Sequence, residues 1–281
     1  MSAVLFYGSC MRAKDPLASD NPVFDFYVVA DRYWNFYRNP MLSLVNWLLP
    51  PNVFYFELPW QDSSLRAKYA VVSLDQLRRR VGPAGFHSYF WARLSQPMRL
   101  AFVRGDETRS DIVNVLRQAV VTLFGQSIGL MQGRFTARSL WIRAYQESYR
   151  AELRAENQDR STLIYEADRS RNDAMAQDVL ATFGVQASRR DAELEFDTVS
   201  SGATLRWTQR IWALRRLAGK LLSSLRLIKA AFTFDGATHY ILWKIERHSG
   251  IKPNMTAWEK RHPLVSAPAI AWRLYRQGAF R

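Results

Sequence analysis

The sequence is poor in the residues that build disulfide frameworks and zinc sites. Cys10 is the only cysteine among the 281 residues, which excludes an internal disulfide and a four-thiolate zinc site. The four histidines, at positions 87, 239, 248 and 262, show no paired metal-ligand spacing. We therefore expect a protein of a reducing compartment without a histidine-rich zinc site.

Long hydrophobic runs are also missing. No continuous apolar stretch approaches the roughly 18 residues that a membrane-spanning helix needs. Residues 1–10 have no basic segment followed by an apolar one and are not rich in arginine, so we expect neither a secretory signal nor an organellar transit peptide. Apolar residues make up 48% of the chain and charged residues 23%, which indicates a globular protein.

Acidic residues are scarce in one region only. Residues 201–281 contain 15 Lys and Arg against 3 Asp and Glu, a net charge of +12, whereas the whole chain has 39 against 25, a net charge of +14. Nearly all the excess positive charge therefore lies in this last region. Such an asymmetry predicts an anionic partner, either a membrane surface or a nucleic acid.

The first 105 residues alternate between short apolar strands and short helices. Strands are predicted at 3–7, 23–30, 53–58 and 68–73, an extended segment at 98–103, and helices at 32–48, 74–81 and 87–95. The strand at 23–30 is apolar on both faces, which predicts a central, covered strand. Ser73 is expected to cap the helix that follows it. This alternation is typical of an α/β unit.

The rest of the chain is predicted to be mainly helical. Helices are expected at 110–124, 136–156 and 162–183, a short strand at 193–196, a long amphipathic helix at 203–232 and shorter pieces at 240–247 and 270–276. Apolar residues recur along the long helix every three or four positions: Trp207, Ile211, Leu214, Ala218, Leu221, Leu225, Ile228 and Phe232. Its charged residues are all Lys or Arg.

The apolar stripe of the long helix has two interpretations. A stripe with this spacing usually packs against a protein core. Alternatively, a helix with cations and no acids, to which Trp207 and Trp212 add interfacial character, can lie in the headgroup plane of an anionic membrane. The aromatic residues follow the apolar face and not the basic one, which disfavours stacking on the bases of a nucleic acid.

A candidate phosphate site lies at the start of the chain. Gly8 and Ser9 follow the first predicted strand, and Asp25 lies in the second. Glycine lets a triphosphate approach the backbone, serine offers a hydroxyl and an amide, and the carboxylate can hold Mg²⁺ against the same phosphates. This logic is that of nucleotidyltransferases of the polymerase-β type, which usually carry a second acid at the position of Tyr27. The alternative is an ordinary turn followed by a half-exposed aspartate.

Several segments, in order, resemble one family. They are Tyr7-Gly8-Ser9, Val23–Asp31, Asn52–Tyr55, Ala67–Ser73 and Ala92–Pro97. Together they are similar to the mitochondrial translocator assembly and maintenance protein family, the peripheral phosphatidate cytidylyltransferases, of which this chain resembles a divergent, bacterial-like member. The resemblance covers roughly residues 4–130, and Cys10 stands where the family usually has glycine.

The resemblance implies an activity, a location and an organisation. It implies transfer of CMP from CTP to phosphatidic acid, giving CDP-diacylglycerol and pyrophosphate, with Mg²⁺ as cofactor. The enzyme would be peripheral on the cytoplasmic face of a bacterial inner membrane, or on the matrix face of the mitochondrial inner membrane in a eukaryote. We expect an α/β (α+β), polymerase-β-like nucleotidyltransferase domain at 1–105, a mainly helical second domain at 106–200, and a basic amphipathic membrane-associating region at 201–281.

The resemblance also assigns the site residues. It implies nucleotide binding by Tyr7, Gly8, Ser9, Lys68 and Arg93, catalysis by Asp25 and Lys68, and metal binding by Asp25 and Glu57. Lys68 would neutralise charge on the departing pyrophosphate, and Arg93 would hold a phosphate through its guanidinium.

Alternatives to these assignments stay open at this point. Lys68 could be a solvated strand end, and Arg93 an exposed helix arginine. Glu57 ranks above Asp31 as a second metal ligand, because Asp31 follows Asp25 by six strand residues, about 20 Å. Asp75 reads as an acid in the first turn of a helix. A nucleotidyltransferase acting on RNA or on a small molecule, and an inactive module that binds anionic membranes, are the competing functions.

Overall fold

The protein has a mixed α/β fold that contains a five-stranded sheet. The computed structural model describes residues 1–13, 22–60, 63–152, 159–185, 187–190, 193–198 and 201–233, together with positions 256, 258, 259, 269, 272, 273 and 276. The strands lie in the order β3-β4-β2-β1-β5. Their bounds are β1 (Ala3–Tyr7), β2 (Val23–Ala30), β3 (Asn52–Trp60), β4 (Ser63–Ser73) and β5 (Arg99–Val103). β2 and β4 run in parallel, and the other neighbours are antiparallel.

β2 is the central strand, as its sequence predicts. Its eight residues are β-branched or aromatic apart from Asp25 and Ala30, which favours a strand. Tyr27 and Val29, on one face, are fully buried. The expectation of full cover is wrong for the other face, where Phe24 and Phe26 are only partly buried, close to the Phe6 ring.

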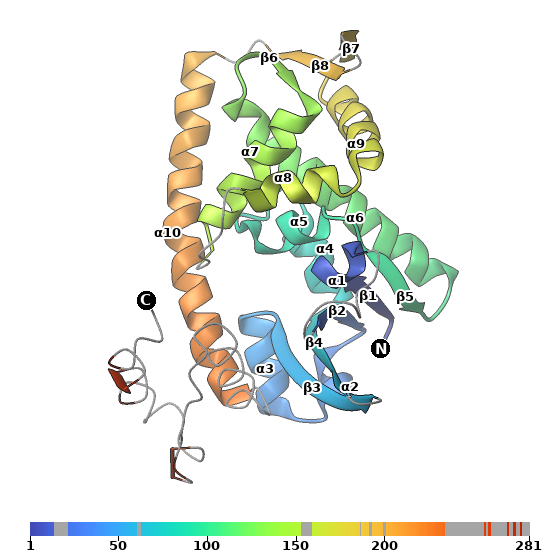
Figure 1. The fold of residues 1–281 in the computed structure, drawn as a ribbon, viewed down its shortest axis with the longest axis vertical. Coiled ribbons are helices and arrows are strands. Elements are labelled where there is room, and N and C mark those ends of the chain that lie inside the picture. The colour runs from blue at the N-terminus through green and yellow to red at the C-terminus, as the bar shows by residue number, and fades with distance from the viewer. Residues whose placement is uncertain are drawn as a thin grey trace.

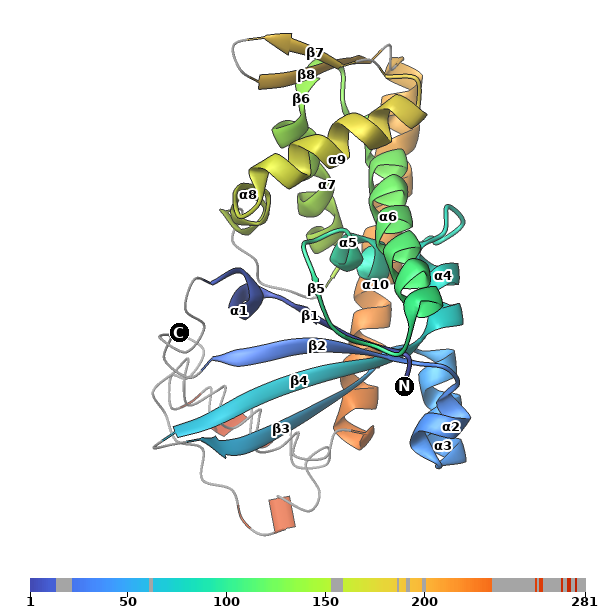
Figure 2. The same ribbon diagram turned by 90° about the vertical axis from the view of Figure 1, so that its right-hand side faces the viewer.

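Three helices cover the face of the sheet that carries Tyr27 and Val29. They are α4 (Leu74–Val81), α5 (Ser88–Leu94) and α6 (Asp106–Ser127), drawn above the strands in Figure 2. The predicted cap of α4 is confirmed, because the Ser73 side chain accepts a hydrogen bond from the Gln76 amide. Leu77 of α4, Trp91 of α5 and Leu123 of α6 are fully buried in the core beneath these helices.

The predicted single helix at 32–48 is wrong, because the chain forms two helices there. α2 (Tyr33–Tyr37) ends at Arg38, which adopts the left-handed conformation with φ 52°. α3 (Pro40–Leu48) then begins with a new cap, as the Asn39 side chain accepts a hydrogen bond from the Leu42 amide. Proline at the first helical position fits such a start.

The predicted helix at 162–183 is also divided. α8 (Asp159–Glu166) is followed by α9 (Arg169–Thr182), whose N-terminus is capped by the side chain of Asp168. α7 (Ala137–Arg150) precedes them, and residues 153–158, which include the end of the helix expected at 136–156, lie outside the described residues. A second sheet joins β6 (Gly133–Thr136), β8 (Glu193–Thr198) and β7 (Ala187–Arg190) in that order.

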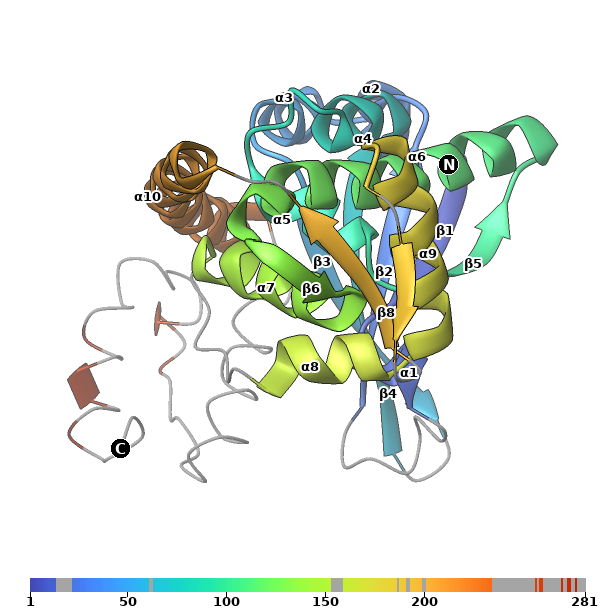
Figure 3. The same ribbon diagram turned by 90° about the horizontal axis from the view of Figure 1, so that it is seen from above.

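The long helix is present as α10 (Gly202–Thr233) and runs along one side of the molecule (Figure 1). Seen from above, it lies outside the layer formed by α5 and α6 (Figure 3). Trp212 is fully buried, packs edge to face on Trp91 at 5.8 Å between ring centroids, and donates a hydrogen bond to the Gln126 carbonyl. Gly219 lies so close to the Ala151 carbonyl that a side chain there would collide with it.

The apolar stripe of α10 does not pack on the core, so the core-facing interpretation is wrong for most of it. Exposed side chains on this helix include Trp207, Leu214, Leu217, Leu221, Leu225, Leu227 and Ile228. The interfacial role expected of Trp212 is wrong as well, because this ring is buried. The expected helix at 240–247 lies outside the described residues, and of 270–276 only positions 272, 273 and 276 are described.

One hydrophobic core connects the predicted regions. It contains Leu5 of β1, Trp141 of α7 and Trp212 of α10. The helical part is therefore packed on the five-stranded sheet through shared side chains. None of the helices in the described ranges combines the length and the apolar character that a membrane crossing requires.

Candidate functional site

The backbone at Gly8 crosses directly over the side chain of Asp25. Tyr7, the last residue of β1, is the register partner of Asp25 in β2, and α1 (Ser9–Arg12) begins one residue after Gly8. Gly8 has φ +92°, and a Cβ built on it would lie 2.9 Å from Asp25 Oδ2. Glycine is therefore required at position 8 for two reasons: the backbone conformation, and the space that the Asp25 side chain occupies.

Asp25 and Lys68 are paired across the two parallel strands. They are register partners in β2 and β4, and Lys68 Nζ lies 3.7 Å from Asp25 Oδ1. The side chain of Asp25 is 26% exposed and that of Lys68 is 28% exposed. The structure thus brings Tyr7, Gly8, Asp25 and Lys68 together, and the interpretation of Lys68 as a solvated strand end is wrong. This half-buried carboxylate and ammonium remain accessible to a charged ligand.

Tyr27 replaces the second acid and is part of the core. Its side chain is fully buried, and its ring stacks on Tyr7 with 4.8 Å between centroids. Within the residues that the structure describes, no three His, Cys, Asp or Glu side chains gather as a metal-binding group. A Mg²⁺ ion here would take one carboxylate ligand from β2, which fits the habit of this ion to keep waters and to bind substrate phosphates.

Glu57 is not placed beside Asp25. Its carboxylate accepts a hydrogen bond from Arg66 Nε at 3.1 Å and another from the Tyr55 hydroxyl. Glu57 on β3 is the register partner of Arg66 on β4, and Lys68, two residues further along β4, is the partner of Asp25 on β2. Glu57 and Asp25 are therefore separated by two inter-strand spacings across the sheet and by two residues along it. This is roughly 12 Å. The hypothesis that Glu57 and Asp25 share one ion therefore lacks a geometric basis.

The other acids weighed from sequence lie elsewhere. Asp31 forms a bidentate pair with Arg104, with distances of 2.7 and 2.8 Å. Hydrogen bonds from Arg104 and Ser2 lower the pKa of Asp31 to about 2. Asp75 lies in the first turn of α4, as expected, and is exposed.

Arg93 is largely buried, with 13% of its side chain exposed, and is not the exposed helix arginine of the alternative interpretation. Its Nη2 donates a hydrogen bond to Glu152 Oε2 at 2.7 Å, and its guanidinium lies over the Tyr89 ring at 4.4 Å. Burial by itself lowers the pKa of Arg93, but Glu152 and the nearby tyrosine hydroxyls raise it well above its usual value, so the side chain stays charged. Tyr7 and Tyr27 are among these tyrosines, which places Arg93 near the residues that flank Asp25 in the sheet.

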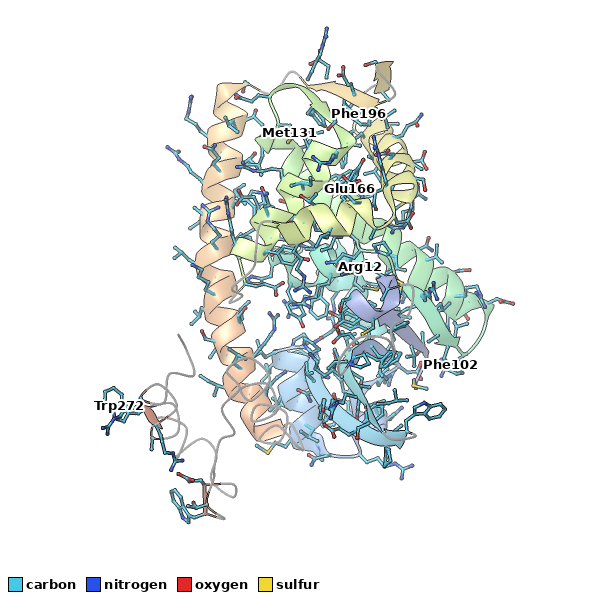
Figure 4. The ribbon with its side chains drawn as sticks, viewed as in Figure 1. Arg12, Phe102, Met131, Glu166, Phe196 and Trp272 are labelled. Atoms are coloured by element: carbon cyan, nitrogen blue, oxygen red, sulfur yellow. The ribbon has the colours of Figure 1, made fainter. Side chains whose placement is uncertain are left out.

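Arg12 belongs to the site and was not found from the sequence. It is the last residue of α1 and lies between the sheet and the helices above it (Figure 4). Its Nη1 is buried and has no hydrogen-bond partner among the described residues. Burial lowers the pKa of Arg12, and Asp25 is among the groups that act against this. Arg12 follows Gly8 by four residues, about one helical turn, and this spacing could have identified it from the sequence.

Cys10 is a structural residue of the same turn. Its thiol is buried and donates a hydrogen bond to the Val23 carbonyl at 3.2 Å. Burial, followed by the charge of Asp25, raises the pKa of the thiol. Cys10 is therefore an unreactive thiol that fixes α1 against the start of β2.

Comparisons with known proteins add little to this geometry. No protein-family model matches the chain, and no curated protein is similar to it. Among solved structures, the chain is similar to a nucleotidyltransferase-like protein from Exiguobacterium sibiricum 255-15, with 9% sequence identity, 99% of this chain and 86% of that chain covered, and a TM-score of 0.28. A likeness at this level carries no argument about fold or activity.

Proposed function

We propose that this protein is a nucleotidyltransferase of the polymerase-β type that transfers CMP from CTP to phosphatidic acid at a membrane surface. The single observation that carries the transferase proposal is the close passage of the Gly8 backbone over Asp25, with Lys68 opposite. An ordinary turn has no need of a glycine pressed against a carboxylate. CTP, phosphatidic acid and Mg²⁺ are proposed from the family resemblance of residues 4–130.

The proposed mechanism assigns one task to each side chain of the site. Gly8 leaves room for the triphosphate next to the backbone, and the Ser9 hydroxyl donates to a phosphate oxygen. The Asp25 carboxylate would hold Mg²⁺, which when bound neutralises phosphate charge. Lys68, released from its pairing with Asp25, offsets the charge on the departing pyrophosphate. A phosphate oxygen of the acceptor is already ionised, so the transfer needs no general base.

The net charge around Asp25 supports an anionic substrate. Arg12 and Lys68 both lie within electrostatic reach of this one carboxylate. A half-buried site with two cations and one anion favours the binding of a polyanion such as a triphosphate. The buried Nη1 of Arg12 supplies a hydrogen-bond donor that no described side chain or backbone group accepts.

Attachment to an anionic membrane is proposed from α10. The helix carries seven Lys or Arg and no Asp or Glu, and Leu217 and Leu221, on its outer side, are 71% and 63% exposed. Apolar insertion and charge attraction are the two contributions that hold such helices on anionic membranes. The cytoplasmic face of a bacterial inner membrane, or the mitochondrial matrix face, is the proposed location.

Pyrophosphate release measures this function directly. The full chain would be incubated with Mg²⁺ and each of the four nucleoside triphosphates, with and without phosphatidate vesicles. We expect release with CTP that requires phosphatidate. Pyrophosphate release with another nucleotide, or without lipid, would indicate that the acceptor is an RNA or a small molecule. No Mg²⁺-dependent nucleotide binding at all would identify an inactive module, for which Tyr27 in place of an acid is the relevant observation.

A further inference from the structure

Two arginines from distant parts of the chain lie over the same tyrosine ring. Arg93 of α5 and Arg226 of α10 place their guanidinium carbons 4.4 and 4.2 Å from the centroid of Tyr89. Both guanidiniums also lie within electrostatic reach of Tyr27, which follows Asp25 by two residues on the same face of β2. Arg93 and Arg226 therefore lie close to the strand that carries Asp25.

Among the described residues, the cations of this cluster outnumber the anions within reach of them. Arg93 is paired with Glu152, and both side chains are largely buried. Arg226 is near the same carboxylate, so one anion faces two cations. Lys229, one turn further along α10, is buried as well and donates to the carbonyls of Leu49 and Pro51. Positive charge held at partly buried positions is costly unless an anion lies beside it, and a bound anion would meet that need.

The two guanidiniums also keep unused hydrogen-bond donors. Each carries five N–H groups. Arg226 Nε donates to the Pro50 carbonyl at 2.9 Å, and its two Nη atoms donate to no partner in the described part of the chain. Arg93 Nε is buried and has no described acceptor. A group that only fastened α10 to the segment before β3 would need the single bond to Pro50, so the remaining donors are available to a ligand.

We propose that Arg93 and Arg226 form a second phosphate subsite, which holds the phosphate monoester of the acceptor while Gly8, Ser9 and Lys68 hold the triphosphate. This inference rests on the proposed function and gives Arg93 to the acceptor instead of the nucleotide. Paired guanidiniums suit a phosphate monoester, because each offers two parallel N–H groups to two phosphate oxygens. Through Arg226, α10 would contribute to this subsite, although the outer side of the helix carries the exposed apolar stripe.

The test distinguishes an effect on binding of the acceptor from an effect on binding of the nucleotide. Arg226→Gln and Arg226→Lys would be compared with Arg117→Gln, which alters an exposed arginine of α6. For Arg226→Gln we expect KM for phosphatidate in detergent micelles to rise about 10–100-fold, the loss that follows from removing charge-assisted hydrogen bonds. KM for CTP should change less than threefold. Arg226→Lys keeps the charge but not the planar fork, so its KM for phosphatidate should lie between those of the wild type and Arg226→Gln.

A binding measurement keeps this test independent of turnover. Calorimetry with short-chain phosphatidate micelles and with soluble glycerol 3-phosphate asks whether the subsite recognises the phosphate monoester itself or only a lipid. Weaker binding of both ligands to Arg226→Gln supports a phosphate subsite, and a change with the micelles alone identifies a lipid headgroup subsite. Unchanged affinity for both in a folded variant overturns the inference, even if the wild type turns over CTP.

The same data distinguish failure of the subsite from failure of the proposed function. If the wild type releases no pyrophosphate but Arg226→Gln loses phosphatidate binding, the subsite stands and the transferase proposal falls. If Arg226→Gln raises KM for CTP as much as KM for phosphatidate, Arg226 serves the nucleotide and the acceptor subsite is wrong. A thermal midpoint within a few degrees of the wild type is required of each variant. Should Arg226→Gln not fold, Arg226→Lys carries the same comparison.

Discussion

Gly8 and Asp25 approach each other so closely that no other residue fits at position 8 without moving the carboxylate. The virtual Cβ of Gly8 lies 2.9 Å from Asp25 Oδ2 and 3.4 Å from Asp25 Cβ. Backbone and carboxylate are held there by the register of β1 and β2, in which Tyr7 and Asp25 are partners. The proposed phosphate site therefore depends on strand pairing in the sheet core, and not on a mobile loop.

Replacing Gly8 by alanine should damage the site more than the fold. The substitution forces a side chain into a backbone conformation, φ 92° and ψ −167°, that glycine alone adopts readily, which costs about 1–3 kcal/mol of stability, and displaces the Asp25 carboxylate. Gly133→Ala is the matched control, because Gly133 has φ +60° but nothing within 4 Å of its virtual Cβ. Both variants should lose stability in urea titrations, Gly8→Ala somewhat more because of the contact with Asp25, whereas only Gly8→Ala should lose CTP binding. Equal CTP affinity in the two variants would show that the triphosphate does not bind next to Gly8.

Asp25→Asn should remove turnover and leave the fold intact. The shape of the side chain is kept while the charge proposed to hold Mg²⁺ is lost, which commonly costs about 10²–10³ in rate. Its pairing with Lys68 is partly exposed and worth at most ~1 kcal/mol. Asp75→Asn serves as control, because Asp75 pairs with Arg78 at 3.8 Å on the surface. Turnover of Asp25→Asn within threefold of the Asp75→Asn value would show that Asp25 does not hold the metal.

Lys229 should make the stability of the protein rise with pH. Burial, with the charge of Arg226 as a smaller cause, lowers the pKa of Lys229 to about 7, against about 10.4 in an unfolded chain. Between these two values the unfolded state binds more protons than the folded state, so the free energy of unfolding increases with pH. We expect an increase of about 1–3 kcal/mol between pH 7 and pH 10.

Lys229→Met isolates this contribution. The variant removes the titrating group and keeps an apolar side chain of similar length at the same buried position of α10. Urea titrations at several pH values would be compared between the variant and the wild type, so that the titration of other groups cancels. The difference in unfolding free energy should slope with pH between 7 and 10. A flat difference means that the two carbonyl acceptors, of Leu49 and Pro51, keep the ammonium charged after folding.

The outer face of α10 should bind membranes without supporting the fold. Leu214 and Leu221 are exposed, so the double variant Leu214→Gln/Leu221→Gln should change stability by no more than about 0.5 kcal/mol per site. Its flotation with anionic vesicles should fall strongly. Leu163→Gln, an exposed leucine of α8, is the matched control and should float normally. By contrast, Trp212→Ala should cost about 3–5 kcal/mol, because the ring is buried on Trp91.

Two outcomes would contradict the membrane proposal for α10. If the double variant floats as well as the wild type, the stripe does not contact lipid. If it instead loses several kcal/mol of stability, the stripe is covered by another part of the protein in solution. Both results would leave the catalytic proposal untouched, because pyrophosphate release in detergent does not depend on vesicle binding.

Local sequence patterns predicted most of the elements but not their interruptions. β2 was predicted with its observed bounds, and Ser73 was correctly recognised as the cap of α4. The breaks at Arg38 and Asp168 were missed, since each interrupts an apolar pattern that continues on both sides. Asn39 followed by Pro40, and Asp168, are capping signals that outweighed this periodicity.

Only the part of the candidate site that is formed by neighbouring segments of the chain was predicted from the sequence. Gly8, Ser9 and Asp25 are recognisable because the strand, the turn and the next strand are close in sequence. Arg226 was counted only among the cations of a basic helix, although it lies over the Tyr89 ring. A separation of more than 130 residues between Tyr89 and Arg226 leaves no pattern that a reading of sequence could detect.

The sequence by itself determined the α/β character of the first 105 residues, the long cationic helix and the Gly-Ser turn near an aspartate, because periodicity, capping and charge are local properties. Only the tertiary structure decided which side of α10 is buried. The periodicity shows an apolar stripe, but the helix packs through Trp212, Gly219 and Lys229 and leaves the leucines outside. Burial depends on the shape and the hydrogen-bond acceptors of the opposing surface, here the Gln126 and Leu49 carbonyls, and no local pattern contains that surface.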